Sequence, residues 1–197
     1  MNRTQLDARL KDYLNRANLT QEALDAFVEN AESLMNRALR HPKMLQRVDL
    51  TLPEDSKIVA LPSDILQLLT VRVNDAIMRQ YPSTAVEMLT AGAGVGYIVR
   101  GDCIEFFPAL AAGTEVFLDY RAAIPTLVGG TATENWVSRT FSDVYLYACL
   151  AEAAVYLKDD QRLQLWSGKL ASIIETLEGQ GWEQNIADAP LVVMLDG

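Results

Sequence analysis

Residues 96–108 read Gly-Tyr-Ile-Val-Arg-Gly-Asp-Cys-Ile-Glu-Phe-Phe-Pro. Two apolar runs flank the dipeptide Gly101-Asp102, and a glycine in the first position of a two-residue loop is typical of a type II′ hairpin turn. Both runs are rich in isoleucine, valine, tyrosine and phenylalanine, which favour strands. The stretch therefore predicts an antiparallel β-hairpin in the middle of the chain, and the segments on either side decide what surrounds it.

Further strand patterns lie near the hairpin. Apolar and polar residues alternate at 48–52, 70–74 and 115–120, and residues 57–60 form a short apolar run. Alternation with a period of two indicates a half-buried strand. Together with the hairpin, these segments predict a small antiparallel module of about five or six short strands. Residues 83–89 are expected to form one short helix within it.

Two amphipathic helices are predicted before the module, within residues 1–42. Thr4 is the expected N-cap of the first helix and Thr20 that of the second, and Pro42 ends the second helix. Apolar residues follow the spacings of three and four that mark one face of a helix. These residues are Leu6, Leu10, Tyr13, Leu14 and Ala17 in the first helix, and Leu24, Phe27, Val28, Ala31, Leu34, Met35, Ala38 and Leu39 in the second.

Helical patterns return in the last third of the chain. Trp136 is expected in a short helical turn. A long segment that is apolar nearly all round follows, with Ser142 or Asp143 as its N-cap, so it should be the buried central helix of a bundle. The last helix is expected to end at Gly179 or Gly181.

The order of these elements predicts the fold class. Isolated pairs of short helices are marginally stable, so the N- and C-terminal pairs should pack together as one bundle from which the β module projects. The expected fold is α+β: a helical bundle from the N- and C-terminal helix pairs, an inserted antiparallel β module and an extended C-terminal tail. The expected boundaries are 1–42 for the first helix pair, 43–127 for the β module, 128–182 for the C-terminal helices and 183–197 for the extension.

The composition limits the function classes. The chain has 197 residues and a formal net charge of −9, and its lysines and arginines are scattered. Proteins that bind nucleic acid neutralise phosphates with clustered basic residues, so sequence-specific DNA binding is not expected. The polar N-terminal residues contain no signal-peptide core, and no apolar run reaches the ~20 residues of a membrane span. We therefore expect no membrane contact and a protein made in a cytoplasm, where the isolated thiols of Cys103 and Cys149 stay reduced.

No catalytic or metal-binding motif is visible. The only histidine, His41, follows the second predicted helix and is expected to interact with the dipole of that helix. One histidine without a CxxC pair does not make a zinc site, and the loop Gly92–Gly96 matches neither common phosphate-binding motif. We expect no enzyme, no cofactor and no metal. A hydrolase and a chaperone-like protein-binding module are the alternatives from other classes.

Two apolar features go beyond what folding requires. The C-terminal run after the last predicted helix is Leu191-Val192-Val193-Met194-Leu195. It is either a buried strand that closes the β module or a segment that docks on another chain, since an exposed apolar strand is an aggregation hazard. In the pair Phe106-Phe107, both faces of a strand carry phenylalanine. Either one ring faces a neighbouring subunit or the module has a core on both sides.

Several short motifs follow one another over about residues 58–178. They are Leu61-Pro62-Ser63-Asp64-Ile65, the hairpin 96–108, residues 116–120, Ile124-Pro125-Thr126-Leu127, Asn135-Trp136, residues 141–150 and residues 156–159. In this order they resemble the head–tail connector proteins of tailed bacteriophages, also called adaptor or head-completion proteins. The N-terminal helix pair is also found in such proteins.

The resemblance implies a structural protein of the virion neck, with no catalytic residues to carry over. Such proteins form a homo-oligomeric ring, usually of twelve copies, that binds the portal protein and connects the head to downstream tail or neck proteins. It also implies that the run 191–195 reaches towards the portal. An acidic ring would repel phosphate, so genomic DNA would pass through its channel without sequence-specific binding. A tail-completion or tail-tube-associated subunit is the nearest alternative.

Overall fold

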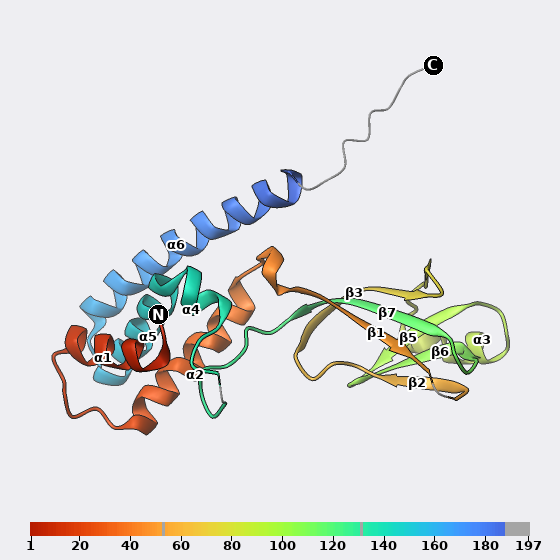
Figure 1. Cartoon of the computed structure of the whole chain (residues 1–197), viewed down its shortest axis with the longest axis horizontal. Coiled ribbons are helices and arrows are strands. Elements are labelled where there is room, and N and C mark those ends of the chain that lie inside the picture. Colours follow the sequence, from red (N-terminus) through yellow and green to blue (C-terminus); the bar gives the residue numbers. More distant parts are fainter. Residues whose placement is uncertain (53, 131, 188–197) are drawn as a thin grey trace, which may run out of the picture. The chain divides into compact units, whose positions relative to one another are not determined.

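The chain folds into two compact units (Figure 1). The computed structural model describes residues 1–52, 54–130 and 132–187. A helical unit consists of residues 1–43 together with the chain from Ile124 onwards, and a β module consists of residues 44–123. The fold is α+β, as the sequence predicts, because the β module is inserted between two helical segments.

The first two helices are α1 (Arg3–Leu14) and α2 (Gln21–Ala38). Thr20 is the N-cap of α2, as predicted, and its hydroxyl accepts a hydrogen bond from the backbone N–H of Ala23 at 3.3 Å. The predicted cap of α1 is wrong. Asn2 is the N-cap and forms a capping box with Gln5, so the helix begins before Thr4. Asparagine caps a helix at least as well as threonine, and a glutamine three residues later supplies the reciprocal bond.

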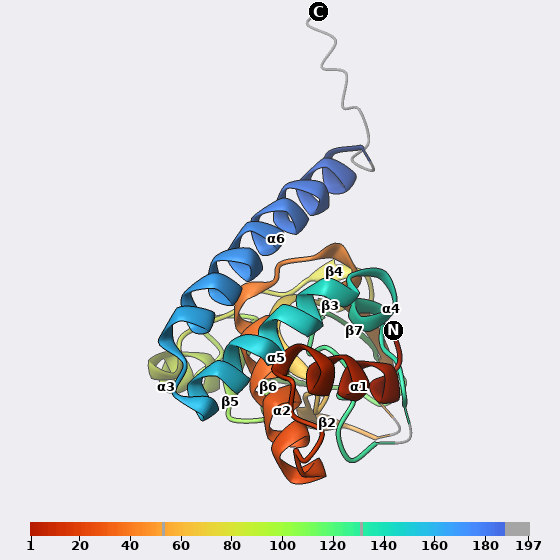
Figure 2. The ribbon, with the colours of Figure 1, turned by 90° about the vertical axis from the view of Figure 1, so that its left-hand side faces the viewer.

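Three further helices among the described residues belong to the helical unit: α4 (Trp136–Thr140), α5 (Ser142–Leu157) and α6 (Asp160–Ala187). The prediction of a central helix is confirmed for α5, which packs against α1, α2, α4 and α6. Figure 2 shows α5 lying between α6 and the N-terminal helices. The buried residues of α5 are Val144, Tyr145, Leu146, Ala148, Cys149, Leu150, Ala151, Ala153 and Ala154.

Two predicted helix boundaries are wrong. Neither Ser142 nor Asp143 caps α5. Its N-cap is Phe141, without a side-chain hydrogen bond, because α4 ends at the preceding residue and the chain passes directly into the next helix. The last helix, α6, continues through Gly179 and Gly181 instead of ending there. A glycine costs about 1 kcal/mol in a helix interior, which weakens the helix but stops it only where the backbone turns left-handed.

Among the described residues, the β module contains seven strands in two antiparallel sheets. Sheet A has the order β1–β7–β3–β4 and sheet B the order β2–β6–β5. The strands are β1 (Leu45–Thr51), β2 (Ser56–Ala60), β3 (Ile65–Val73), β4 (Ala76–Ile77), β5 (Gly96–Arg100), β6 (Cys103–Leu110) and β7 (Glu115–Ala122). Strand β4 was not predicted. Asn74 and Asp75 both adopt positive φ in the turn before it, a conformation that these two residue types tolerate.

The predicted hairpin is formed by β5 and β6. Its register pairs Arg100 with Cys103 across the turn. Gly101 has a φ of +55°, whereas Asp102 is not left-handed, as a type II′ turn requires. The short helix expected at 83–89 is also present, as one 3-10 turn (Ser83–Ala85) followed by α3 (Val86–Thr90). A further 3-10 turn, Pro42–Met44, follows α2.

Apolar side chains from both sheets form the main core of the β module. They are Leu52, Val59, Val71, Tyr97, Ile104, Phe106, Val116 and Leu118. Helix α3 covers the other face of sheet B, where its Leu89 packs with Ile98 and Phe107. Phe106 and Phe107 are therefore both buried, on opposite sides of sheet B. A core on both sides of the strand explains this aromatic pair, and neither ring is exposed to a neighbour.

Candidate functional surfaces

His41 lies in an aromatic cluster. Its ring centroid is 5.1 Å from that of Trp136 and 5.5 Å from that of Phe141, and only 8% of the residue is exposed. The Nδ1 atom of His41 accepts a hydrogen bond from the backbone N–H of Lys43 at 3.1 Å. Burial, followed by the nearby charge of Lys43, lowers the pKa of His41 below 6.5. The predicted interaction of a charged His41 with the helix dipole is therefore wrong. Arg40 takes that place, since its Nη1 donates to the carbonyl oxygen of Arg37 at 2.8 Å.

We expect His41 to make the helical unit less stable at acidic pH. The folded pKa is lower than the unfolded one, so the unfolded chain takes up the proton first. This stability is present above about pH 6.5 and is lost as the pH falls through the folded pKa. Urea unfolding should be measured by tryptophan fluorescence at about pH 7.5 and about pH 5. The free energy of unfolding should fall more in the wild type than in His41→Gln, and equal losses would contradict the assignment.

The two cysteines lie in different surroundings. Cys149 is fully buried in α5, and burial raises the pKa of its thiol. Cys103 is partly exposed at the start of β6. In residues 1–52, 54–130 and 132–187, no group of three or more histidine, cysteine, aspartate or glutamate residues is placed to hold a metal ion.

A buried polar cluster was not foreseen from the sequence. Oε1 of Glu32 on α2 accepts hydrogen bonds from the backbone N–H of Leu127 at 2.8 Å and from the hydroxyl of Tyr145 at 3.0 Å. The amide Nδ2 of Asn135 donates to the same hydroxyl at 2.5 Å and to the carbonyl oxygen of Pro125 at 2.7 Å. Burial, followed by the charge of Glu32, raises the pKa of Tyr145, so its hydroxyl keeps the proton it donates.

This cluster connects three parts of the helical unit. Glu32 belongs to α2, Tyr145 to α5, and Asn135 is the N-cap of α4. Buried polar groups that are all paired fix one arrangement of the elements that carry them. The signal in the sequence is a glutamate inside the apolar stripe of α2, next to Ala31. The cluster therefore has a structural role: its hydrogen bonds link α2, α5 and the segment before α4.

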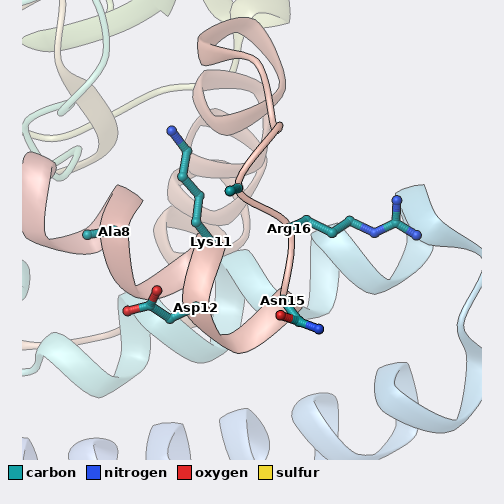
Figure 3. Close-up of a pocket in the computed structure, with 6 residues that line it drawn as sticks. Ala8, Lys11, Asp12, Asn15 and Arg16 are labelled. Carbon is teal, nitrogen blue, oxygen red and sulfur yellow. The ribbon is translucent and has the colours of Figure 1, made fainter.

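One hollow in the helical unit lies at the end of α1. It has a volume of about 430 Å³ and is lined by Ala8, Lys11, Asp12, Asn15, Arg16 and Ala17. Figure 3 shows that the side chains of Lys11, Asp12 and Arg16 extend in different directions. Catalytic and ligand-binding sites need polar groups that converge on one point. These side chains do not converge, so we assign no chemistry to the hollow.

The outer face of sheet A combines exposed apolar and charged side chains. Strand register places alternate residues of neighbouring strands on this face. Arg47 on β1 and Asp119 on β7 form a two-pronged ion pair with N–O distances of 2.7 and 3.3 Å. Beside it, Leu45 and Leu69 are 48% and 44% exposed and line a hollow of about 380 Å³. We take this face as a candidate protein-binding surface because its exposed leucines lie next to one another around a hollow.

The candidate tail site, Leu191 to Leu195, lies outside the described residues. Among the described residues, the outer face of sheet A is the candidate functional surface. A model of a family described as SU10 adaptor protein matches residues 1–194. The chain belongs to the SU10 adaptor protein family.

The family gives the exposed surfaces of the chain a role. An SU10 adaptor is a structural protein of a bacteriophage particle, and an adaptor works through contacts with other phage structural proteins. The resemblance found in the sequence is thereby confirmed at the level of the family. No curated protein matches this adaptor. None of its helices in the described part of the chain is long and apolar enough to cross a membrane.

Proposed function

We propose that this adaptor forms a ring in the neck of the virion, binds the portal protein and connects the head to the tail around the DNA channel. The family match over residues 1–194 carries the proposal. A ring of identical subunits needs two different contact surfaces on each subunit, and closure leaves neither surface exposed. The exposed leucines on the outer face of sheet A suit such a role, because they would be covered in the assembled ring.

The adaptor acts without catalysis, cofactor or metal. Three buried groups of the helical unit make hydrogen bonds within it: Oε1 of Glu32, the hydroxyl of Tyr145 and Nδ1 of His41. Genomic DNA passes through the channel of the proposed ring without sequence-specific binding. With a formal net charge of −9, a ring of this protein carries many negative charges around the channel, which favours sliding of DNA over binding. A channel lining that proved basic would overturn this point.

The C-terminal run Leu191 to Leu195 is the proposed portal anchor. Its five apolar residues lie between Asp188 and Asp196, and strand-forming residues of this kind bind readily to an open sheet edge or an apolar groove. A tail-completion or tail-tube-associated subunit would use the same run against a tail protein instead. The partner of the run therefore separates the two assignments.

Light scattering during size-exclusion chromatography tests the proposal. The adaptor is measured alone and after mixing with the portal ring of the same phage. We expect the portal peak to gain the mass of a full set of adaptor subunits. A portal peak of unchanged mass would overturn portal binding and favour a tail protein as the partner.

The anchor is tested in the same experiment with matched variants. A chain with Val192→Asp and Met194→Asp should no longer shift the portal peak, because two charges replace apolar anchor residues. The control Asp196→Asn changes a charge next to the run but leaves the run intact, and it should bind normally. Normal binding by the double variant would show that the portal holds another surface.

A further inference from the structure

Arg72 on β3, on the outer face of sheet A, has a side-chain hydrogen-bond donor without an acceptor in the described part of the chain. Its Nε atom is buried and has no hydrogen-bond partner among the described residues. Register places Arg72 in one row with three side chains of the neighbouring strands, namely Ile77 on β4, Phe117 on β7 and Asp49 on β1. A buried N–H normally has an acceptor. An acceptor from outside the described residues would supply the hydrogen bond that this N–H group lacks.

Exposed apolar side chains lie on two of the strands that form this row, β3 and β4. Ile77, directly opposite Arg72, is 72% exposed. Strand β3 has two register shifts against β7, and the two residues at these shifts, Leu66 and Leu69, are both more than 40% exposed. Bulges of this kind redirect side chains and are retained where they serve a purpose. The outer face of sheet A thus offers a cationic donor directly between Ile77 and Phe117, in a row that also holds Asp49.

The opposite side of the β module offers the complementary groups. Helix α3 lies there, on the face of sheet B that points away from sheet A. Its Glu87 is exposed and makes no side-chain hydrogen bond or ion pair with the described residues. Beside it, Met88 is 41% exposed, and Val95 in the following loop is 63% exposed. This surface, which we call the α3 surface, offers an anionic acceptor among apolar side chains.

We propose that the outer face of sheet A in one copy of the chain binds the α3 surface of the next copy. The two surfaces lie on opposite sides of one module, so their contact is head-to-tail and repeats from copy to copy, as a ring requires. The contact places the carboxylate of Glu87 against the guanidinium of Arg72, and the side chains of Met88 and Val95 against Ile77 and its apolar neighbours. This inference rests on the proposed ring and assigns its lateral contact.

Cysteine cross-linking tests the contact on the portal complex and on the adaptor alone. Ile77→Cys and Met88→Cys are introduced into a Cys103→Ser chain, in which Cys149 is buried. With a short bismaleimide, a chain that carries both cysteines should give a ladder of oligomers on a denaturing gel. Each single-cysteine chain should give only monomer, and a mixture of the two single-cysteine chains should give dimers. The Cys103→Ser parent is the control.

The outcomes separate this contact from portal binding. If no ladder forms, the proposed contact between copies is overturned, whether or not the portal peak gains mass. The proposed function is decided separately, by the mass of the portal peak. Dimers from Ile77→Cys alone would mean that two sheet A faces meet, which also overturns a head-to-tail contact.

Charge exchange supplies a second readout. Arg72→Glu and Glu87→Arg should each weaken adaptor self-association by about tenfold or more, because like charges then face each other. The chain with both changes should recover most of the association, since the pair is restored with reversed sign. Arg9→Glu, an exposed change in α1, is the charge control and should leave association unchanged. A double variant as weak as the single variants would overturn the pairing.

Discussion

Replacing Gly96 by alanine should destabilise the β module by about 3 kcal/mol, a typical cost of forcing an extra methyl group into a tightly packed site. A Cβ atom at this position would lie 2.4 Å from the carbonyl oxygen of Arg79 and 2.6 Å from the ring of Tyr81. The carbonyl belongs to the backbone that bonds to β5: the N–H of Tyr97 donates to it at 2.9 Å. It cannot move away without breaking that bond.

Hydrogen exchange followed by mass spectrometry measures this effect separately in each unit. Peptides from β5 and β6 should lose protection in Gly96→Ala, whereas peptides from α5 should keep theirs. Gly168→Ala is the matched control, because Gly168 lies in α6 and an added Cβ would meet nothing within 4 Å. That variant should stabilise α6 by up to about 1 kcal/mol. Unchanged protection in Gly96→Ala would contradict the close approach.

Removing the carboxylate of Glu32 should cost the helical unit about 3 kcal/mol. In Glu32→Ala the hydroxyl of Tyr145 and the backbone N–H of Leu127 both lose the oxygen that accepts their hydrogen bonds. Each buried donor without an acceptor costs about 1–3 kcal/mol, and the hydroxyl recovers part of that cost if it rotates towards another acceptor. Glu32→Gln keeps one acceptor oxygen in place, so it should cost only about 1 kcal/mol.

Tryptophan fluorescence reports this loss selectively. All three tryptophans, Trp136, Trp166 and Trp182, belong to the helical unit. The urea midpoint of the fluorescence transition should therefore fall for Glu32→Ala. Glu29→Ala on the same helix is the control: Glu29 is exposed, and its replacement should change the midpoint little. Equal midpoints for Glu32→Ala and Glu29→Ala would refute a structural role of the cluster.

Regular patterns made most of the fold predictable. The apolar stripe of α2, the nearly all-round apolar pattern of α5 and the glycine of the β5–β6 turn each predict the local structure that forms. The stripe of α1 is only partly right: Leu6, Leu10 and Leu14 are buried, but Tyr13 is 52% exposed, and Ala17 lies beyond the end of the helix. Helix ends were harder to predict, because several residue types can form hydrogen bonds with the same free backbone groups. The N-cap of α1, for example, is Asn2 and not the predicted Thr4. Glycines 179 and 181 permit a left-handed end but do not impose one.

The candidate surfaces were harder to predict from the sequence than the fold. Glu32 sits within an apolar stripe, and only its partners on α5 and in the loop before α4 explain why a carboxylate is stable there. The exposure of Leu66 and Leu69 depends on two register shifts, which simple alternation cannot reveal. The role of Leu191 to Leu195 stays a prediction, because those residues lie outside the described part of the chain.

The two connections between the units have a consequence for how such proteins diversify. The chain enters the β module at Met44 and leaves it at Ala123, and the adjoining strands β1 and β7 are hydrogen-bonded neighbours, with Leu45 opposite Arg121. Paired Cα atoms in antiparallel strands are about 5 Å apart, a distance that a short turn also bridges. The insertion of eighty residues between the two halves of the helical unit therefore adds almost no loop-closure entropy to the cost of folding that unit. The module is thus a single insertion whose two ends meet, so we expect that another β module with adjacent ends can replace it without changing the helical unit.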